Sequence, residues 1–218
     1  HASERRLDVL LATVSQQRLD RTLAPLRELG VEAAIVDAAP LALANALDQV
    51  LARENAPEAD GHLLLDLGHR NSWLTLRQKG RPFFSRRLDW GGAQFTQAVA
   101  AATGGSLERA EAWKLDPGTS LAHDSVEADA ARRAIGELGE EVRRSLAFYS
   151  TLAQLPATPA LHVSGGVARI AGLPDALGER LAMPATRFSP LEPGDRGARG
   201  ATPGPQYALA YGLALRAA

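Results

Sequence analysis

The sequence lacks several features, and each absence excludes a class of protein. It has no cysteine among 218 residues, which excludes disulfide scaffolds and thiolate chemistry and fits a reducing compartment. Its apolar runs are short and broken by charge, so we expect no transmembrane helix. The net charge of −1 gives no reason to expect nucleic acid or an anionic membrane as a partner. Its five histidines show no metal-ligand spacing, so no zinc site is expected.

What is present is typical of an α/β fold with a mixed sheet. Pro25 is expected to kink or shorten the first helix, and Gly136 and Gly139 to interrupt the longest one. Residues 189–205 are rich in Gly, Pro and Arg and predict a loop. Apolar periodicity and turn residues predict strands over residues 7–13, 31–36, 62–68, 72–78, 82–88 and 161–163, and helices over 15–29, 40–53, 92–102, 106–115, 123–155, 173–181 and 207–216.

A carboxylate and a glycine stand at the end of an apolar strand. Asp66-Leu67-Gly68 closes the run that begins at His62, and Ser72 follows shortly after. Strand ends of open α/β sheets are common places for phosphate and metal sites. The alternative interpretation is that Asp66 only caps the strand end or turn.

A second pair of polar residues lies on a predicted helix. Glu111 and Lys114 are three positions apart, so they share one helical face. An acceptor and a donor so placed could hold the two hydroxyls of a ribose. The alternative is an exposed ion pair that contributes only ~0.3–0.5 kcal/mol.

The stretch from Leu161 to Pro174 is the most informative in the chain. A short strand ends in Ser164-Gly165-Gly166, Arg169 follows, and a helix begins near Pro174. Glycines at a strand-to-helix turn let a ligand approach the backbone, and a planar guanidinium can stack on a base. The turn could therefore hold an adenine. It could equally be needed only for packing, with Arg169 in solvent.

Together these three patterns resemble the motifs of the actin-like ATPase superfamily. In the order given above, they resemble its second phosphate motif, its ribose-contacting helix and its adenosine motif. Within it the sequence is similar to the PilM family of type IV pilus assembly, whose relatives include the pilus protein MshI and the cytoplasmic part of the type II secretion L protein. The stretches that carry this resemblance, in the family's order, are Asp8–Ala12, Val36–Leu43, Arg77–Arg86, Gly91-Gly92 with Thr96, Glu141–Tyr149 and Ala210–Leu215.

The resemblance implies an actin-like (ribonuclease H-like) α/β fold with mixed sheets flanked by helices. Residues 1–60 would form part of a first lobe (1C/1A-like), and residues 61–218 a second lobe (2A/2B-like) with the C-terminal helix. We expect the chain to begin inside the 1C-like subdomain, without the hairpin that carries the first phosphate motif. It further implies binding of ATP through Asp66, Gly68, Ser72, Glu111, Lys114, Gly165, Gly166 and Arg169, with magnesium at Asp66 through phosphate or water.

In function, the resemblance implies a cytoplasmic scaffold at the inner membrane that binds a cytoplasmic segment of a PilN-like membrane protein. The assembly or secretion ATPase and a second copy of the chain are further expected partners. No catalytic residue is assigned. Two alternatives stay open: an actin-like ATPase or small-molecule kinase, and the membrane-tethered secretion L protein, which would continue into a hydrophobic run of ~20 residues.

Overall fold

The chain divides into two units, residues 1–38 and 39–218, and each is described by itself. The computed structural model describes residues 11–53, 61–78, 81–150, 159–191 and 204–217, with the backbone alone for 81–83 and 217. The lobe boundary expected at residue 60 stays a prediction.

In the first unit, a single described helix buries none of its residues. α1 (Gln16–Glu28) begins after Ser15, whose hydroxyl accepts a hydrogen bond from the backbone N–H of Arg18, as an N-cap does. The helix passes through Pro25, so this proline does not shorten it.

The two strands expected in this unit do not form in its described part. Residues 11–13 are irregular, and the remainder of the first expected strand lies outside the described residues. Residues 31–36 are also irregular, and Val31, Ile35 and Val36 are half exposed or more. A strand needs a neighbour to pair its backbone groups. No described strand of this unit provides one, so the prediction of a strand over residues 31–36 is wrong.

The second unit is built on a five-stranded mixed sheet in the order β3-β2-β1-β4-β5. The first three strands are antiparallel neighbours, whereas β4 and β5 run parallel to β1. The short β5 was not predicted, because three residues with little burial carry no alternating pattern. The strands are β1 (His62–Leu67), β2 (Ser72–Gln78), β3 (Arg81–Leu88), β4 (Ala160–Gly165) and β5 (Ala185–Arg187).

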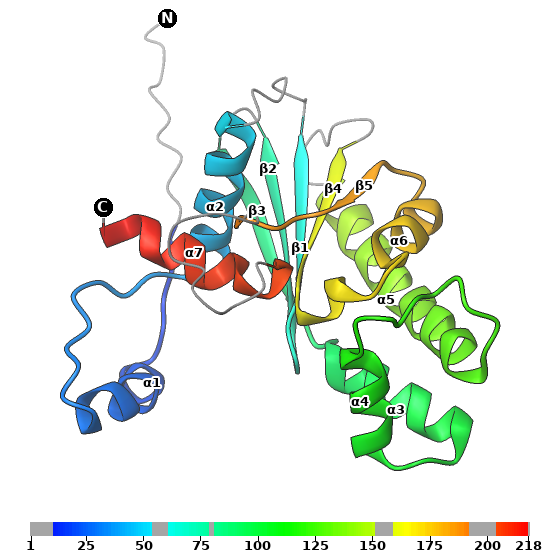
Figure 1. Ribbon diagram of the computed structural model, residues 1–218. Helices are drawn as coiled ribbons and strands as arrows, with labels where there is room; N and C mark the ends of the chain where they lie inside the picture. Colours follow the sequence, from blue (N-terminus) through cyan, green and yellow to red (C-terminus); the bar gives the residue numbers. More distant parts are fainter. Residues whose placement is uncertain (1–10, 54–60, 79–80, 151–158, 192–203, 218) are drawn as a thin grey trace, which may run out of the picture. The chain divides into compact units, whose positions relative to one another are not determined.

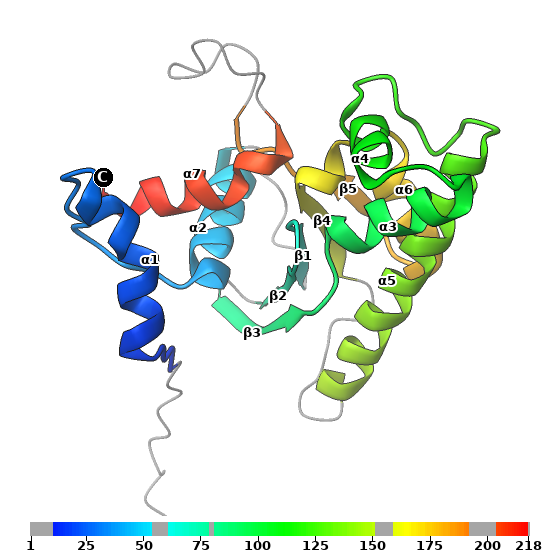
Figure 2. The ribbon, with the colours of Figure 1, turned by 90° about the horizontal axis from the view of Figure 1, so that it is seen from below.

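Helices cover both faces of the sheet (Figures 1 and 2). Alternate residues of β1 point to opposite faces: Leu63 and Leu65 join the core under α3, α5 and α6, and Leu64 joins the core under α2 and α7. No helix in the described residues combines the length and apolar content needed to cross a membrane. The helices of this unit are α2 (Ala39–Arg53), α3 (Gly92–Thr103), α4 (Leu107–Leu115), α5 (Val126–Ser150), α6 (Leu173–Leu181) and α7 (Ala208–Ala214).

The packing of α7 on α2 is unusually close at one point. A Cβ added at Gly212 would lie 1.9 Å from the backbone oxygen of Ala42. Around this crossing, Leu43 and Leu47 of α2 form a core with Ala208 of α7. Only a residue without a side chain allows the two backbones to approach so closely.

The long helix α5 is continuous, so the predicted interruption at Gly136 and Gly139 is wrong. Both glycines lie beneath the side chain of Arg180 from α6. That guanidinium donates a hydrogen bond to Glu140 at 3.0 Å. The glycines therefore leave room for an arginine from the neighbouring helix. The predicted continuation beyond Ser150 falls on residues outside those described.

Candidate functional site

The carboxyl ends of β1 and β4 lie side by side and carry the first predicted site residues. Asp66 is paired in register with Ser164, and its carboxylate accepts a hydrogen bond from the Ser164 hydroxyl at 2.8 Å. Burial raises the pKa of Asp66, an effect that the hydrogen bond from Ser164 only partly opposes. A buried carboxylate with one hydrogen-bond donor would gain from a nearby cation.

The two glycines after Ser164 differ in what surrounds them. Gly165 has φ 89°, and a Cβ there would lie 2.3 Å from the backbone oxygen of Leu67. This glycine is required by the close approach of β4 to β1, with or without a ligand. A Cβ at Gly166 would meet no atom within 4 Å, so Gly166 faces open space that a ligand could use.

The turn that follows β1 is tied to the start of α3. The backbone N–H of Gly92 donates to the carbonyl of Gly68 at 2.8 Å, which holds the predicted phosphate turn against the helix. Ser72 is fully buried, and its hydroxyl donates to the backbone oxygen of Trp90 at 2.7 Å. The Ser72 hydroxyl is therefore engaged inside the protein, where it fixes the turn.

Lys114 is the centre of a buried polar network. Only 6% of its side chain is exposed, against 37% for Glu111. Its ammonium group donates to Glu111 Oε2 at 2.6 Å, to Thr96 Oγ1 at 2.9 Å and to the backbone oxygen of Gly92 at 3.2 Å. The alternative of an exposed ion pair is therefore wrong for Lys114.

The electrostatics of Glu111 follow from this network. Burial by itself raises the pKa of Glu111, but hydrogen bonds from Lys114 and Thr96 outweigh it, so the pKa lies below its usual value. Glu111 is therefore ionised at neutral pH, and its partly exposed carboxylate remains available as an acceptor.

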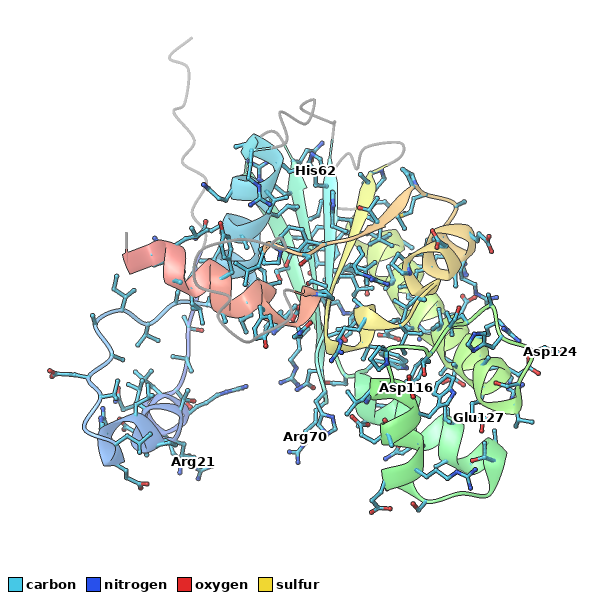
Figure 3. The ribbon with its side chains drawn as sticks, viewed as in Figure 1. Arg21, His62, Arg70, Asp116, Asp124 and Glu127 are labelled. Atoms are coloured by element: carbon cyan, nitrogen blue, oxygen red, sulfur yellow. The ribbon has the colours of Figure 1, made fainter. Side chains whose placement is uncertain are left out.

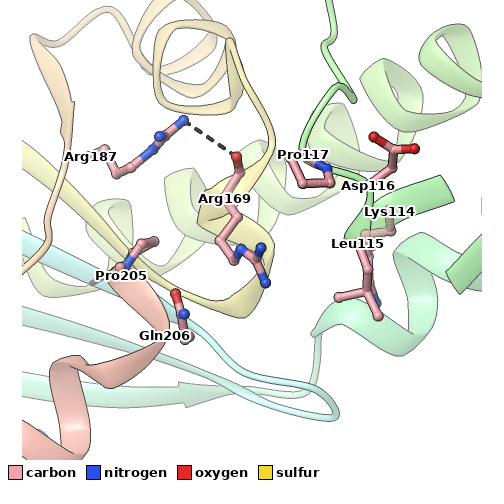
Figure 4. A pocket seen from close by; sticks show the side chains of 9 residues that line it. Lys114, Leu115, Asp116, Pro117, Arg169, Arg187, Pro205 and Gln206 are labelled. Carbon is pink, nitrogen blue, oxygen red and sulfur yellow. Dashed lines mark hydrogen bonds between the residues drawn. The ribbon is translucent and has the colours of Figure 1, made fainter. Parts of the chain in front are cut away.

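Arg169 lies beside a pocket of about 200 Å³ in the second unit. The exposed Arg187 of β5 donates from its guanidinium to the backbone oxygen of Arg169 at 3.5 Å (Figure 4). The sequence did not indicate Arg187 or Gln206 as site residues. The pocket is lined by Lys114, Leu115, Asp116, Pro117, Arg169, Arg187, Gly204, Pro205 and Gln206.

This arrangement can be compared with known proteins. Residues 1–218 match the family described as type IV pilus assembly protein PilM. The chain belongs to the PilM family. It is 30% identical to a chain of the PilM–PilN type IV pilus biogenesis complex, with a TM-score of 0.75, over 92% of this chain and 58% of that one.

Two further structures confirm the actin-like fold of this PilM-family chain. The ethanolamine utilization protein EutJ of Carboxydothermus hydrogenoformans is 17% identical, with a TM-score of 0.69, over 93% of this chain and 62% of that one. MreB5 of Spiroplasma citri, bound to ADP, is 16% identical, with a TM-score of 0.64, over 93% and 65%. The PilM-family chain thus spans less than two thirds of the length of each of these three proteins.

Of the predicted site residues, the structure brings together two groups in the PilM-family chain. Asp66, Gly68, Gly165 and Gly166 lie at the adjoining ends of β1 and β4, while Lys114 and Arg169 line the pocket and Glu111 reaches it through Lys114. The described residues contain no cluster of three or more His, Asp or Glu side chains that could hold a metal ion alone. Magnesium at Asp66 would therefore need phosphate or water as its other ligands.

His62 and His162, which are far apart in the sequence, lie next to each other at the other end of the sheet. His62 Nδ1 and His162 Nε2 are 3.0 Å apart, far from the Arg70 turn (Figure 3). Burial, followed by the charge of the neighbouring His62, lowers the pKa of His162 to about 4. Burial also lowers the pKa of His62, with the charge of Arg77 adding to it. Both rings are therefore neutral at neutral pH and share one N–H···N hydrogen bond.

Proposed function

We propose that this chain is a scaffold of the inner-membrane platform of a type IV pilus or type II secretion machine. In this role it binds a cytoplasmic segment of a PilN-like membrane-anchored protein and lies in the cytoplasm, held at the membrane by its partners. The observation that carries the proposal is the family match over residues 1–218, together with the 30% identity to a chain of the PilM–PilN complex.

The first unit offers a surface that suits such a segment. Its described residues expose several large apolar side chains between Leu11 and Val36, of which Leu29 is 77% exposed and Ile35 56%. Exposed apolar side chains can supply the contacts of a protein interaction site, and contiguous apolar patches mark such sites. We assign the contact with the partner segment to residues 29–36.

The test is direct binding of the N-terminal cytoplasmic peptide of the PilN-like protein, followed by fluorescence anisotropy. The variants Val31→Asp and Ile35→Asp should abolish binding, because each places a charge in an apolar contact. Leu213→Asp is the matched control, since Leu213 is 43% exposed on α7, and it should bind as the wild type does. Unchanged binding by both first-unit variants would overturn the assignment.

Recovery of partners from cells tests the wider role. A pull-down with this chain should retain a PilN-like platform protein, and the assembly or secretion ATPase and a second copy are the further partners that we propose. If the pull-down retains no membrane-platform component, the scaffold proposal is wrong.

Nucleotide modulation is the second part of the proposal. The residues present fit a nucleotide: Gly166 faces open space, Arg169 borders a pocket, and Glu111 remains an ionised acceptor. Asp66 would hold magnesium through phosphate or water, and magnesium would neutralise phosphate charge. Lys114 would position Glu111 toward a ribose, while Ser72 would act by fixing the turn.

Calorimetry with ATP, with and without magnesium, tests this part. We expect magnesium-dependent binding by the wild type and a loss of that dependence in Asp66→Asn. The variant keeps the shape of the side chain and removes its charge. If the wild type binds no nucleotide, the second part fails, while the peptide experiment still decides the first.

A further inference from the structure

The sheet of the second unit ends in an edge strand. β3 is the outermost strand, and none of the described residues forms a strand on its other side (Figure 2). In an antiparallel pair, alternate residues of a strand turn their backbone N–H and C=O groups away from the partner strand. The stretch Phe84–Leu88 therefore presents backbone donors and acceptors with which a further strand can pair.

Side chains of β3 and α5 form a mixed apolar and basic surface beside this edge. Phe84 stacks on Tyr149 of α5 with the ring centroids 3.7 Å apart, and Phe148 packs edge-on against the same tyrosine at 5.3 Å. Arg86 lies on the same face of β3 as Phe84, 3.6 Å from Glu141 of α5. Phe148 is 57% exposed, so more than half of it is accessible to a partner. Arginine and aromatic side chains are enriched at protein interfaces.

The charge of this surface is positive. The carboxylate of Glu141 is shared between the guanidinium groups of Arg86 and Arg144, whose side chains are 40% and 67% exposed. A second copy of β3, paired antiparallel with this edge, would place Arg86 opposite Arg86. Like charges that face each other across two strands are destabilising, and charged side chains on an edge strand oppose self-pairing. The edge therefore disfavours a second copy of the chain and favours a strand that carries carboxylates.

We propose that this edge binds an extended acidic segment of a partner protein by strand addition, at a surface separate from residues 29–36. The segment forms hydrogen bonds with the backbone of Phe84–Leu88. Residues two positions apart on a strand share a face. The segment therefore carries an acidic residue opposite Arg86 and, two positions away, an apolar residue opposite Phe84 and within reach of Phe148. The edge thus recognises a carboxylate and an apolar side chain that alternate along one face of a strand.

The experiment uses the whole chain and short synthetic peptides that carry a fluorescent label. The test peptide has threonine at every other position and glutamate, valine and glutamate at the positions between, so that its two faces differ. A second peptide has lysine in place of each glutamate. Fluorescence anisotropy measures binding. Hydrogen–deuterium exchange of residues 84–88 shows whether the backbone of β3 becomes hydrogen-bonded, which contact through side chains alone would not cause.

We expect the wild type to bind the glutamate peptide more tightly than the lysine peptide, with slower exchange at residues 84–88. Arg86→Glu should bind the glutamate peptide roughly 2- to 30-fold more weakly, because an opposite-charge pair across the strands becomes a like-charge pair, and should prefer the lysine peptide. Phe148→Ser should weaken binding and keep the wild-type preference. Arg133→Glu makes the same change of charge at an exposed position in the N-terminal half of α5 and should behave as the wild type. Circular dichroism checks that the variants fold.

Four results would overturn this assignment of the β3 edge. If the wild type does not bind the glutamate peptide, the edge does not accept an acidic strand. Equal binding by the wild type and Arg86→Glu would show that the charge of Arg86 does not select the segment. Binding with unchanged exchange at residues 84–88 would mean that the peptide does not join the sheet. Protection of these residues that increases with protein concentration, in the absence of peptide, would assign the edge to a second copy of the chain.

Discussion

The close crossing of α2 and α7 makes Gly212→Ala a sharp test of the fold. Alanine at a helix interior normally stabilises by about 0.5–1 kcal/mol relative to glycine. Here the added Cβ would lie 1.9 Å from the backbone oxygen of Ala42, against 3.4–4 Å for ordinary contact, so α7 would have to withdraw by about 1.5 Å. The obstacle is backbone and cannot rotate away. Overpacking of this kind costs about 1–3 kcal/mol, and we expect a net loss of about 2 kcal/mol.

The assay is urea unfolding followed by circular dichroism, with Gly136→Ala as the matched control. Gly136 also lies inside a helix, but a Cβ there meets its nearest atom, in the Arg180 side chain, at 3.7 Å. That variant should gain about 0.5–1 kcal/mol of stability. If Gly212→Ala is as stable as the wild type while Gly136→Ala shows its gain, the reasoning from the close crossing is wrong.

Three further predictions concern single side chains. The pKa of His162 is lowered to about 4, so the stability that the neutral ring contributes should be present above pH 6.5 and lost as the pH falls toward 4, roughly 3 kcal/mol in all; urea titrations should show this loss shrink in His162→Gln and persist in His123→Gln. Because burial raises the pKa of Asp66, its charge costs stability at neutral pH, and Asp66→Asn should unfold at higher urea at pH 7 than the wild type, with the difference vanishing in acid; a lower midpoint at pH 7 would contradict this. Gly139→Ala should show no gain in thermal unfolding, because its Cβ would lie 2.7 Å from Cγ of Arg180.

The sequence predicted the order of elements in the second unit because each apolar strand or helix there packs against other elements of the same unit. β1 to β4 and the helices from α2 to α7 all formed near their expected positions. The pattern over residues 31–36 is equally apolar, yet it forms no strand, since pairing depends on a neighbour that a local pattern cannot reveal. The same limit applies to Gly136 and Gly139. Their local sequence predicts a helix break, and the Arg180 side chain that they accommodate is 41 residues or more away in the chain.

The sequence predicted the position of those site residues that are defined by residue type and by their place at a strand end. It did not predict which hydrogen-bond partner each side chain has. Asp66 and Gly165 stand at the strand ends where the motif placed them. Ser72 satisfies a backbone oxygen inside the protein, and the pairing of His62 with His162 depends on the register of two strands. These hydrogen-bond partners are set by the tertiary structure, and the spacing of residues along the sequence carries no information about it.

The packing of α7 on α2 also has a consequence for synthesis on the ribosome. At roughly 5–20 residues per second, the interval between the emergence of α2 and that of α7 lasts on the order of 10 s. The finished protein buries Leu43, Leu47 and Leu64 in one core with Ala208 of α7. During this time α7 is absent and does not shield these leucines from water. The nascent chain therefore carries an uncovered apolar sheet face until α7 has been made, which makes this side of the molecule the natural place for a chaperone to bind.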